Sequence, residues 1–180
     1  MLEDENYLPR KDNNHLLKLE KGFTGELKFD KWLEDFSLEC LVLNDLLLEY
    51  NQTIFQFDTL ILTKETIYII EIKNYEGDFI IEGERWYTIT KKEINNPLLQ
   101  LKRSESLLHR IIKDYGYHFS IQSYLIFINP HFHLYQALPN LPIIFPTQLD
   151  RFKQKMNNKS LTLGKTPIQT CSDFTIYPTS

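Results

Sequence analysis

The chain has 180 residues, of which 42% are hydrophobic and 24% charged, and this composition predicts one globular domain with a good-sized core. Its formal net charge of −4 argues against a protein that coats nucleic acid through a general positive field, so any nucleic-acid contact must be local. Every apolar run is far shorter than the roughly 20 residues that a membrane-spanning helix requires. The start of the chain does not resemble a signal peptide, and Cys40 and Cys171 are too few for a disulfide framework. We therefore expect a cytoplasmic protein with two free thiols.

Short apolar segments follow a polar start. The polar composition of residues 1–21 predicts a loosely held N-terminal arm. The spacing of apolar residues from Gly25 predicts a helix that runs to about Asp35. Runs of aliphatic and aromatic residues then predict a meander of strands separated by polar or glycine-containing turns. These strands are expected over residues 41–48, 54–62, 66–72, 79–82 and 86–90.

The second half of the chain contains the clearest helix. It opens with Asn96 as N-cap and Pro97 in the first helical position, and leucines recur at helical spacing until Gly116. The remaining elements are a strand at 121–128, a short strand at 142–146, a helix at 147–157 and a candidate strand at 174–177. This order predicts an α/β or α+β sandwich around a mixed sheet. We expect one domain over residues 22–158 and a C-terminal tail over 159–180.

A polar cluster is predicted on the second and third strands. If Lys64-Glu65 forms a two-residue hairpin loop, antiparallel pairing places Asp58 opposite Glu71 and Gln56 opposite Lys73, all on one face. Like charges directly across a strand pair destabilise it unless a proton or a cation intervenes. A hard divalent cation is the natural partner for two such carboxylates.

These residue types suit metal-assisted hydrolysis. Asp58, Glu71 and the backbone carbonyl of Ile72 would form an oxygen-rich site for Mg²⁺ or Mn²⁺, which keeps several waters. The metal can acidify a water and polarise a phosphoryl oxygen, while the ammonium group of Lys73 stabilises the charge that develops. The spacing therefore predicts phosphodiester cleavage.

Several motifs in a fixed order resemble one family. They are Gly22-Phe-Thr-Gly-Glu26, Asp58, Ile70-Glu-Ile-Lys-Asn74 with Gly77 after it, and Asn96-Pro-Leu-Leu-Gln100. Together they resemble the nuclease-related domain (NERD) family, a branch of the PD-(D/E)XK phosphodiesterase superfamily, over roughly residues 22–115. The acidic segment 74–78 departs from the small polar loop that such domains often have at this point.

The resemblance implies both a fold and a site. It implies an α/β/α sandwich around a central mixed sheet, restriction-endonuclease-like, whose central strands carry the active site. It also implies metal binding by Asp58 and Glu71, catalysis by Lys73, and supporting roles for Glu26 and Gln100.

The long helix has a basic side that could guide a phosphate backbone. The basic residues are Lys102, Arg103, Arg110 and Lys113, with His109 beside them. A solvated helix face is the alternative explanation, because such charges are normal wherever a helix meets water.

We therefore expect a metal-dependent nuclease that acts on DNA, with RNA as a second candidate substrate. Three alternatives remain open from the sequence. The chain could be a nucleic-acid-binding module of the same fold that has lost cleavage, or an adaptor for a larger assembly. The acidic residues could also be ordinary strand-end charges turned to solvent.

Overall fold

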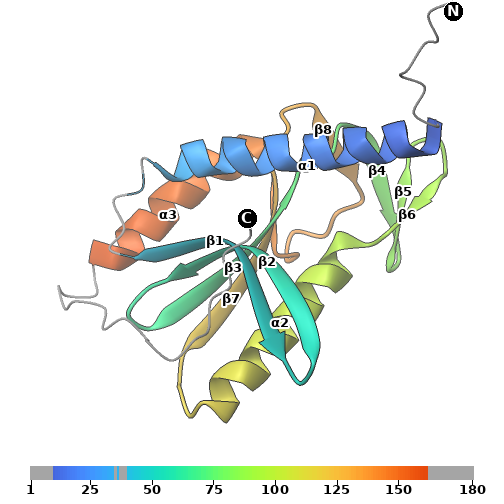
Figure 1. Ribbon diagram of the computed structural model, residues 1–180. Helices are drawn as coiled ribbons and strands as arrows, with labels where there is room; N and C mark the ends of the chain where they lie inside the picture. Colours follow the sequence, from blue (N-terminus) through green and yellow to red (C-terminus); the bar gives the residue numbers. More distant parts are fainter. Residues whose placement is uncertain (1–9, 35, 37–39, 162–180) are drawn as a thin grey trace, which may run out of the picture.

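A five-stranded mixed sheet forms the centre of the protein, in the order β1-β2-β3-β7-β9 (Figure 1). The computed structural model describes residues 10–34, 36 and 40–161. The first three strands are antiparallel to one another, and β7 and β9 then continue the sheet parallel to β3. The bounds are β1 Leu41–Tyr50, β2 Thr53–Leu62, β3 Thr66–Lys73, β7 Ser120–Phe127 and β9 Ile143–Ile144.

Helices cover both faces of this sheet. α1 (Arg10–Leu33) and α3 (Leu149–Leu161) lie on one side, and α2 (Pro97–Asp114) lies on the other (Figure 1). A short 3₁₀ helix, η1 (Pro146–Gln148), leads into α3. The prediction of a restriction-endonuclease-like α/β/α sandwich is confirmed. None of the described helices is long and apolar enough to span a membrane.

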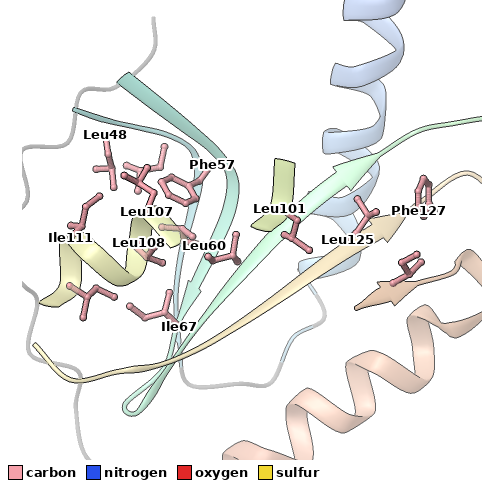
Figure 2. Close-up of a cluster of buried hydrophobic side chains, with 14 of the residues drawn as sticks. Leu48, Phe57, Leu60, Ile67, Leu101, Leu107, Leu108, Ile111, Leu125 and Phe127 are labelled. Carbon is pink, nitrogen blue, oxygen red and sulfur yellow. The ribbon is translucent and has the colours of Figure 1, made fainter. Parts of the chain in front are cut away.

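The sheet separates two hydrophobic clusters because successive strand residues point to opposite faces. Ile69 of β3 packs toward α2, whereas Ile70 packs toward α1 and α3. The α2 side is shown in Figure 2, where leucines of the helix meet β2, β3 and β7; its labelled members include Leu60, Ile67, Leu101, Leu108 and Leu125. The cluster on the other side is smaller and contains Phe29, Ile61, Ile126, Phe152 and Met156.

A second sheet, in the order β6-β5-β4-β8, begins where β3 and β7 end. Its strands are β4 (Gly77–Glu82), β5 (Arg85–Thr88), β6 (Glu93–Ile94) and β8 (Phe132–Tyr135). The amide of Gly77 donates to the His131 carbonyl at 2.9 Å, and the buried ring of Trp86 stacks on Phe127. The residues after Lys73 therefore lie at the junction of the two sheets.

Most predicted elements are present, but the N-terminal region differs from the prediction. The helix expected from Gly25 to about Asp35 begins at Arg10 and ends at Leu33, so residues 10–21 of the predicted arm form the first half of α1. Residues 11–21 contain neither proline nor glycine, and Lys, Leu and Glu favour helices. The four-residue strand β8 was not predicted. The expected strand at 174–177 lies outside the described residues, and the domain division stays a prediction.

Candidate active site

The β2–β3 hairpin brings Asp58 next to Glu71. The loop has two residues, as predicted, because the amide of Thr63 donates to the Thr66 carbonyl at 2.9 Å. The ladder pairs Thr59 with Ile70, so the next position in the same register sets Asp58 against Glu71. Beyond that pair Asp58 departs from a regular ladder, since its Oδ2 accepts a hydrogen bond of 2.9 Å from the Ile72 amide. This bond fixes one oxygen of the Asp58 carboxylate at the end of the hairpin.

Glu71 is a buried carboxyl group, only 2% exposed, on a strand otherwise filled by isoleucines. Burial, together with the negative charge of Asp58, raises the pKa of Glu71 to about 7. Burial also raises the pKa of Asp58, although hydrogen bonds from Ile72 and from the Glu71 carboxyl group lower it in part. A raised pKa is the response expected of paired carboxylates that have no cation between them.

Lys73 supplies the positive charge of this cluster. Its Nζ lies 2.7 Å from Glu71 Oε1, and its side chain is 19% exposed. Burial disfavours the charged form, but the carboxyl groups of Glu71 and Asp58 outweigh burial and raise the pKa of Lys73 above its ordinary value. Lys73 is therefore an ammonium group at neutral pH and donates hydrogen bonds.

Gln56 does not join the cluster, so this part of the prediction is wrong. The described pairing of β2 with β3 ends at Thr59–Ile70, and Gln56 instead pairs with Leu47 of β1. Its Nε2 donates to the Asp45 carboxylate. At the end of this ladder Asp58 bonds to the Ile72 amide, and no described strand pair joins Gln56 to Lys73.

Asp45 is a site residue that sequence reasoning missed. It lies between the pairs Asn44–Thr59 and Leu46–Phe57, which places it against Asp58 across β1 and β2. Its φ of 49° is in the left-handed region that Asp tolerates better than most residues. Its charge raises the pKa of Asp58 and of Glu26. The polar pair at 44 and 45, inside an otherwise apolar strand, was the signal that could have revealed it.

Helix α1 brings Glu26 to the edge of the site. Gly25 is buried against Asn74, whose Nδ2 donates to the Lys21 carbonyl at 2.8 Å. Burial, followed by the charge of Asp58, raises the pKa of Glu26, while Lys73 lowers it. The carboxyl group of Glu26 thus lies within the field of Asp58, Asp45 and Lys73.

Helix α2 brings Gln100 from the other side. Asn96 caps the helix by accepting from the Leu98 amide at 2.9 Å, and its Nδ2 donates to the Glu84 carbonyl at 2.8 Å. Gln100 follows in the first turn, and its side-chain hydrogen bond lowers the pKa of Glu71. The cap therefore fixes the position from which Gln100 holds the buried carboxylate.

The acidic loop after β3 is directed away from the carboxylates. Glu76 forms an ion pair of 2.7 Å with Lys21, and Asp78 accepts from Tyr135 Oη at 3.3 Å.

Tyr75 packs against Phe79 and Phe127. Burial raises the pKa of its phenol, and the negative charge of Glu71 raises it further. Tyr75 is a second residue beside the site that sequence reasoning did not single out.

The donor set fits a hard cation that keeps part of its water shell. Over the described ranges, no three His, Cys, Asp or Glu side chains are placed to hold a metal ion by themselves. Two carboxyl groups are nevertheless adjacent, Glu71 buried and Asp58 half-buried, and burial raises the pKa of both. Carboxylate and carbonyl oxygens with water completing the shell are the ligands that Mg²⁺ prefers.

A family comparison agrees with this geometry. The family model described as nuclease-related domain matches residues 21–128. The chain belongs to the NERD family. NERD domains belong to the PD-(D/E)XK-like nuclease superfamily, so the nuclease-related character of the chain is established. A search of curated proteins finds no match, and a search of solved structures finds none either.

The NERD match spans every residue of the cluster. Glu26, Asp58, Glu71, Lys73 and Gln100 come from α1, β2, β3 and α2, and all lie inside the matched region. The fold brings them together from 75 residues of sequence into one electrostatic group. The basic residues of the NERD domain's α2, Lys102, Arg103 and Arg110, are all exposed and lie on the same helix as Gln100.

Proposed function

We propose that this NERD domain is a metal-dependent nuclease that hydrolyses phosphodiester bonds, with DNA as the expected substrate. One observation carries the proposal: two adjacent carboxyl groups, the buried Glu71 and the half-buried Asp58, are held with the ammonium group of Lys73 at 2.7 Å from Glu71. An acid pair withdrawn from water in this way is costly unless it is neutralised. A function that needs a cation between Asp58 and Glu71 explains why the fold keeps this acid pair.

Asp58, Glu71 and the carbonyl of Ile72 would hold Mg²⁺ or Mn²⁺. The Oδ2 of Asp58 is already fixed by the Ile72 amide, so its other oxygen is the one offered to a cation. A divalent cation held there supplies Lewis acidity both to the attacking water and to a phosphoryl oxygen. The pKa of about 7 at Glu71 means that cation binding must displace a proton below neutral pH.

Lys73 stabilises charge and does not act as a base. Because Glu71 and Asp58 raise its pKa, it carries a proton throughout the neutral range. As water attacks phosphorus, negative charge grows on the phosphoryl oxygens. The Lys73 ammonium group donates one N–H to Glu71, and its other two N–H groups can donate to those oxygens. Lys73 would thus orient the water and steady the transition state.

Glu26 and Gln100 support this centre from two helices. Glu26 has a raised pKa and faces Asp58, so it would accept a proton or position a water or a second cation. Gln100 hydrogen-bonds Glu71 and would keep that carboxylate oriented. Both roles depend on where α1 and α2 dock.

The exposed side of α2 would contact the phosphate backbone of the substrate. Lys102 and Arg103 lie within one turn of Gln100, and Arg110 lies about 15 Å from it along the helix. The net charge of −4 makes such local contacts necessary. These side chains would position the strand without reading its sequence.

Cleavage of a panel of DNA and RNA substrates with Mg²⁺, Mn²⁺ or a chelator tests the function. Wild-type protein should cut only with metal, and Lys73→Ala should be about 10²-fold to 10³-fold slower. The exposed Lys92→Ala is the control and should match wild type. Equal activity of wild type and Lys73→Ala under every metal would refute the proposal.

Calorimetric titration with Mn²⁺ separates a nuclease from a module that binds nucleic acid without cutting. A working site should bind Mn²⁺ and lose it in Asp58→Asn. A vestigial site should bind the metal poorly even where the protein retards labelled DNA in a salt-dependent way.

A further inference from the structure

A pocket of about 510 Å³ lies at the C-terminal end of α2, at the end of the sheet opposite to the carboxylate cluster. The helix ends in a hydrogen-bonded reversal. Gly116, at a φ of 73°, donates its amide to the Lys113 carbonyl, and the Tyr117 amide donates to the Ile112 carbonyl. The chain then turns into β7, where the Ser120 amide donates to the Glu65 carbonyl at 2.9 Å. The pocket is thus bounded by well-bonded backbone on both sides.

Positive charge and aromatic surface line this pocket together. Arg110 and Lys113 of α2 are exposed cationic side chains at its rim. The rings of Tyr117 and Phe119 form another side, with their centroids 6.4 Å apart. The other lining residues are His109, Ile112, His118 and Ser120. Among the described residues that line the pocket, none carries a carboxylate.

The charge at this point is local and not a property of the whole surface. The chain as a whole is negative, and the C-terminal end of a helix carries partial negative charge that opposes an anion. Asp114, the acid nearest in sequence to Lys113, accepts a hydrogen bond from the Tyr50 hydroxyl on β1. Attraction of an anion here must therefore come from Arg110 and Lys113.

We propose that this pocket is a nucleotide-binding site, separate from the carboxylate cluster. The phosphate would lie beside Arg110 and Lys113, and the base would pack on Tyr117 or Phe119. Cationic and aromatic groups side by side are the combination that binds a phosphate and a base at once. The volume falls in the range of roughly 300–1,000 Å³ typical of small-molecule sites. The nucleotide is either free or the phosphorylated end of a strand.

This site goes beyond the proposed nuclease activity, because it requires neither a metal nor cleavage. Arg110 lies ten residues after Gln100 on the same helix, which corresponds to about 15 Å. A strand that reached both places would follow the exposed side of α2. Arg110 is shared with the proposed contacts to the phosphate backbone, but nucleotide binding in excess chelator does not depend on the carboxylate cluster and is tested apart from cleavage.

Calorimetric titration of the full chain with deoxyadenosine monophosphate in excess chelator tests the pocket. Arg110→Ala combined with Lys113→Ala should weaken binding by about tenfold or more, because two charge-assisted contacts are lost. The control Lys92→Ala with Lys155→Ala removes the same charge from exposed positions on other elements and should match wild type. In the NMR spectrum, the ligand should shift the amides of residues 109–120.

The probes also separate the parts of the ligand and its source. Inorganic phosphate and deoxyadenosine should each bind more weakly than the nucleotide. A short oligothymidylate that binds more tightly with a 5′ phosphate than without one would identify a strand end as the ligand. Binding of the free nucleotide without such a preference would identify the nucleotide itself. Equal binding by the double variant and the control, no binding of any nucleotide probe, or phosphate binding as tight as the nucleotide, would overturn the proposal.

Discussion

Gly25 of α1 lies directly against Asn74, the residue that follows Lys73, and a Cβ atom at position 25 would come within 2.7 Å of the Asn74 Cβ. Side-chain carbon atoms do not approach one another this closely without something shifting. The missing side chain therefore sets how near α1 lies to the end of β3. Because Glu26 is the next residue, the same contact decides whether its carboxyl group reaches Asp58.

Gly25→Ala should displace α1 and lower stability by about 1 kcal/mol or more, since overpacking outweighs the better helix propensity of alanine. Gly22→Ala is the matched control, because an added Cβ at position 22 meets nothing within 4 Å. That control should raise stability by about 0.5–1 kcal/mol. Urea unfolding measures both. If the two variants are equally stabilised, the close packing of α1 on Asn74 is wrong.

Gln100→Ala should weaken Mn²⁺ binding by about 10-fold to 100-fold, the usual effect of losing a group that orients a metal ligand. The reason is the hydrogen bond from Gln100, which lowers the pKa of Glu71; without it, Glu71 holds its proton more tightly. Leu99→Ala is the control, because Leu99 is exposed on the same helical turn. Calorimetry near neutral pH provides the measurement. Equal affinities in the two variants would mean that Gln100 has no part in the site.

The metal-free protein should lose stability as the pH rises from about 5 to 8. The pKa of Glu71 is about 7 in the folded state against an ordinary value of 4.5, so the folded state binds a proton more tightly across this interval. The stabilisation that protonated Glu71 gives the folded state is complete below the ordinary Glu pKa of 4.5, and it is lost as the pH rises through about 7. The raised pKa of Asp58 acts in the same direction. Mg²⁺ binds the ionised acids and should therefore restore the most stability near pH 8, where the largest fraction of Glu71 is ionised.

Glu71→Gln tests the origin of this pH dependence. It should flatten the profile and make the metal-free protein more stable than wild type near pH 8, because no buried charge forms. Glu49→Gln, on an exposed residue, should leave the profile unchanged. Thermal melting across the pH range reports both variants. A wild-type profile that rises toward pH 8 without metal would show that the site is neutralised in some other way.

Lys102→Ala combined with Arg103→Ala should reduce the salt dependence of DNA binding. Each lost phosphate contact lowers the slope of log K against log salt concentration by about 0.9 for duplex and about 0.7 for single strands. Lys28→Ala with Lys31→Ala removes the same charge from exposed positions on α1 and serves as the control. Gel retardation or fluorescence anisotropy over a salt series gives the slopes. A change shared by both double variants would indicate a general charge effect and no contact by α2.

The fold could be predicted from the sequence because its signals are local. Alternating or continuous apolar runs marked the central strands, and Asn96-Pro97 marked the start of α2. The N-terminal half of α1 was missed because its apolar face is weak and its residues are largely polar. The short strand β8 was missed because four residues carry too little pattern, and its partner β4 is distant in the sequence.

From residue spacing alone, the candidate site could be predicted only where one hairpin determines it, whereas Glu26 and Gln100 were expected from the family resemblance. The two-residue loop fixes the register, and the register alone brings Asp58 to Glu71. Asp45 and Tyr75 depend on contacts between elements, which no local spacing reveals. Gln56 was misplaced because the spacing assumes that the β2–β3 ladder continues past Thr59–Ile70, and in the structure Gln56 pairs with Leu47 of β1.

A crystal soaked in Mn²⁺ tests the central claim most directly, since the anomalous signal locates the ion without any assay of activity. We predict a peak between the carboxylates of Asp58 and Glu71, at about 2.0–2.2 Å from an oxygen of each. The same density should be absent in Asp58→Asn. Density at another place, or none at saturating Mn²⁺, would contradict the assignment of these two acids as a metal site.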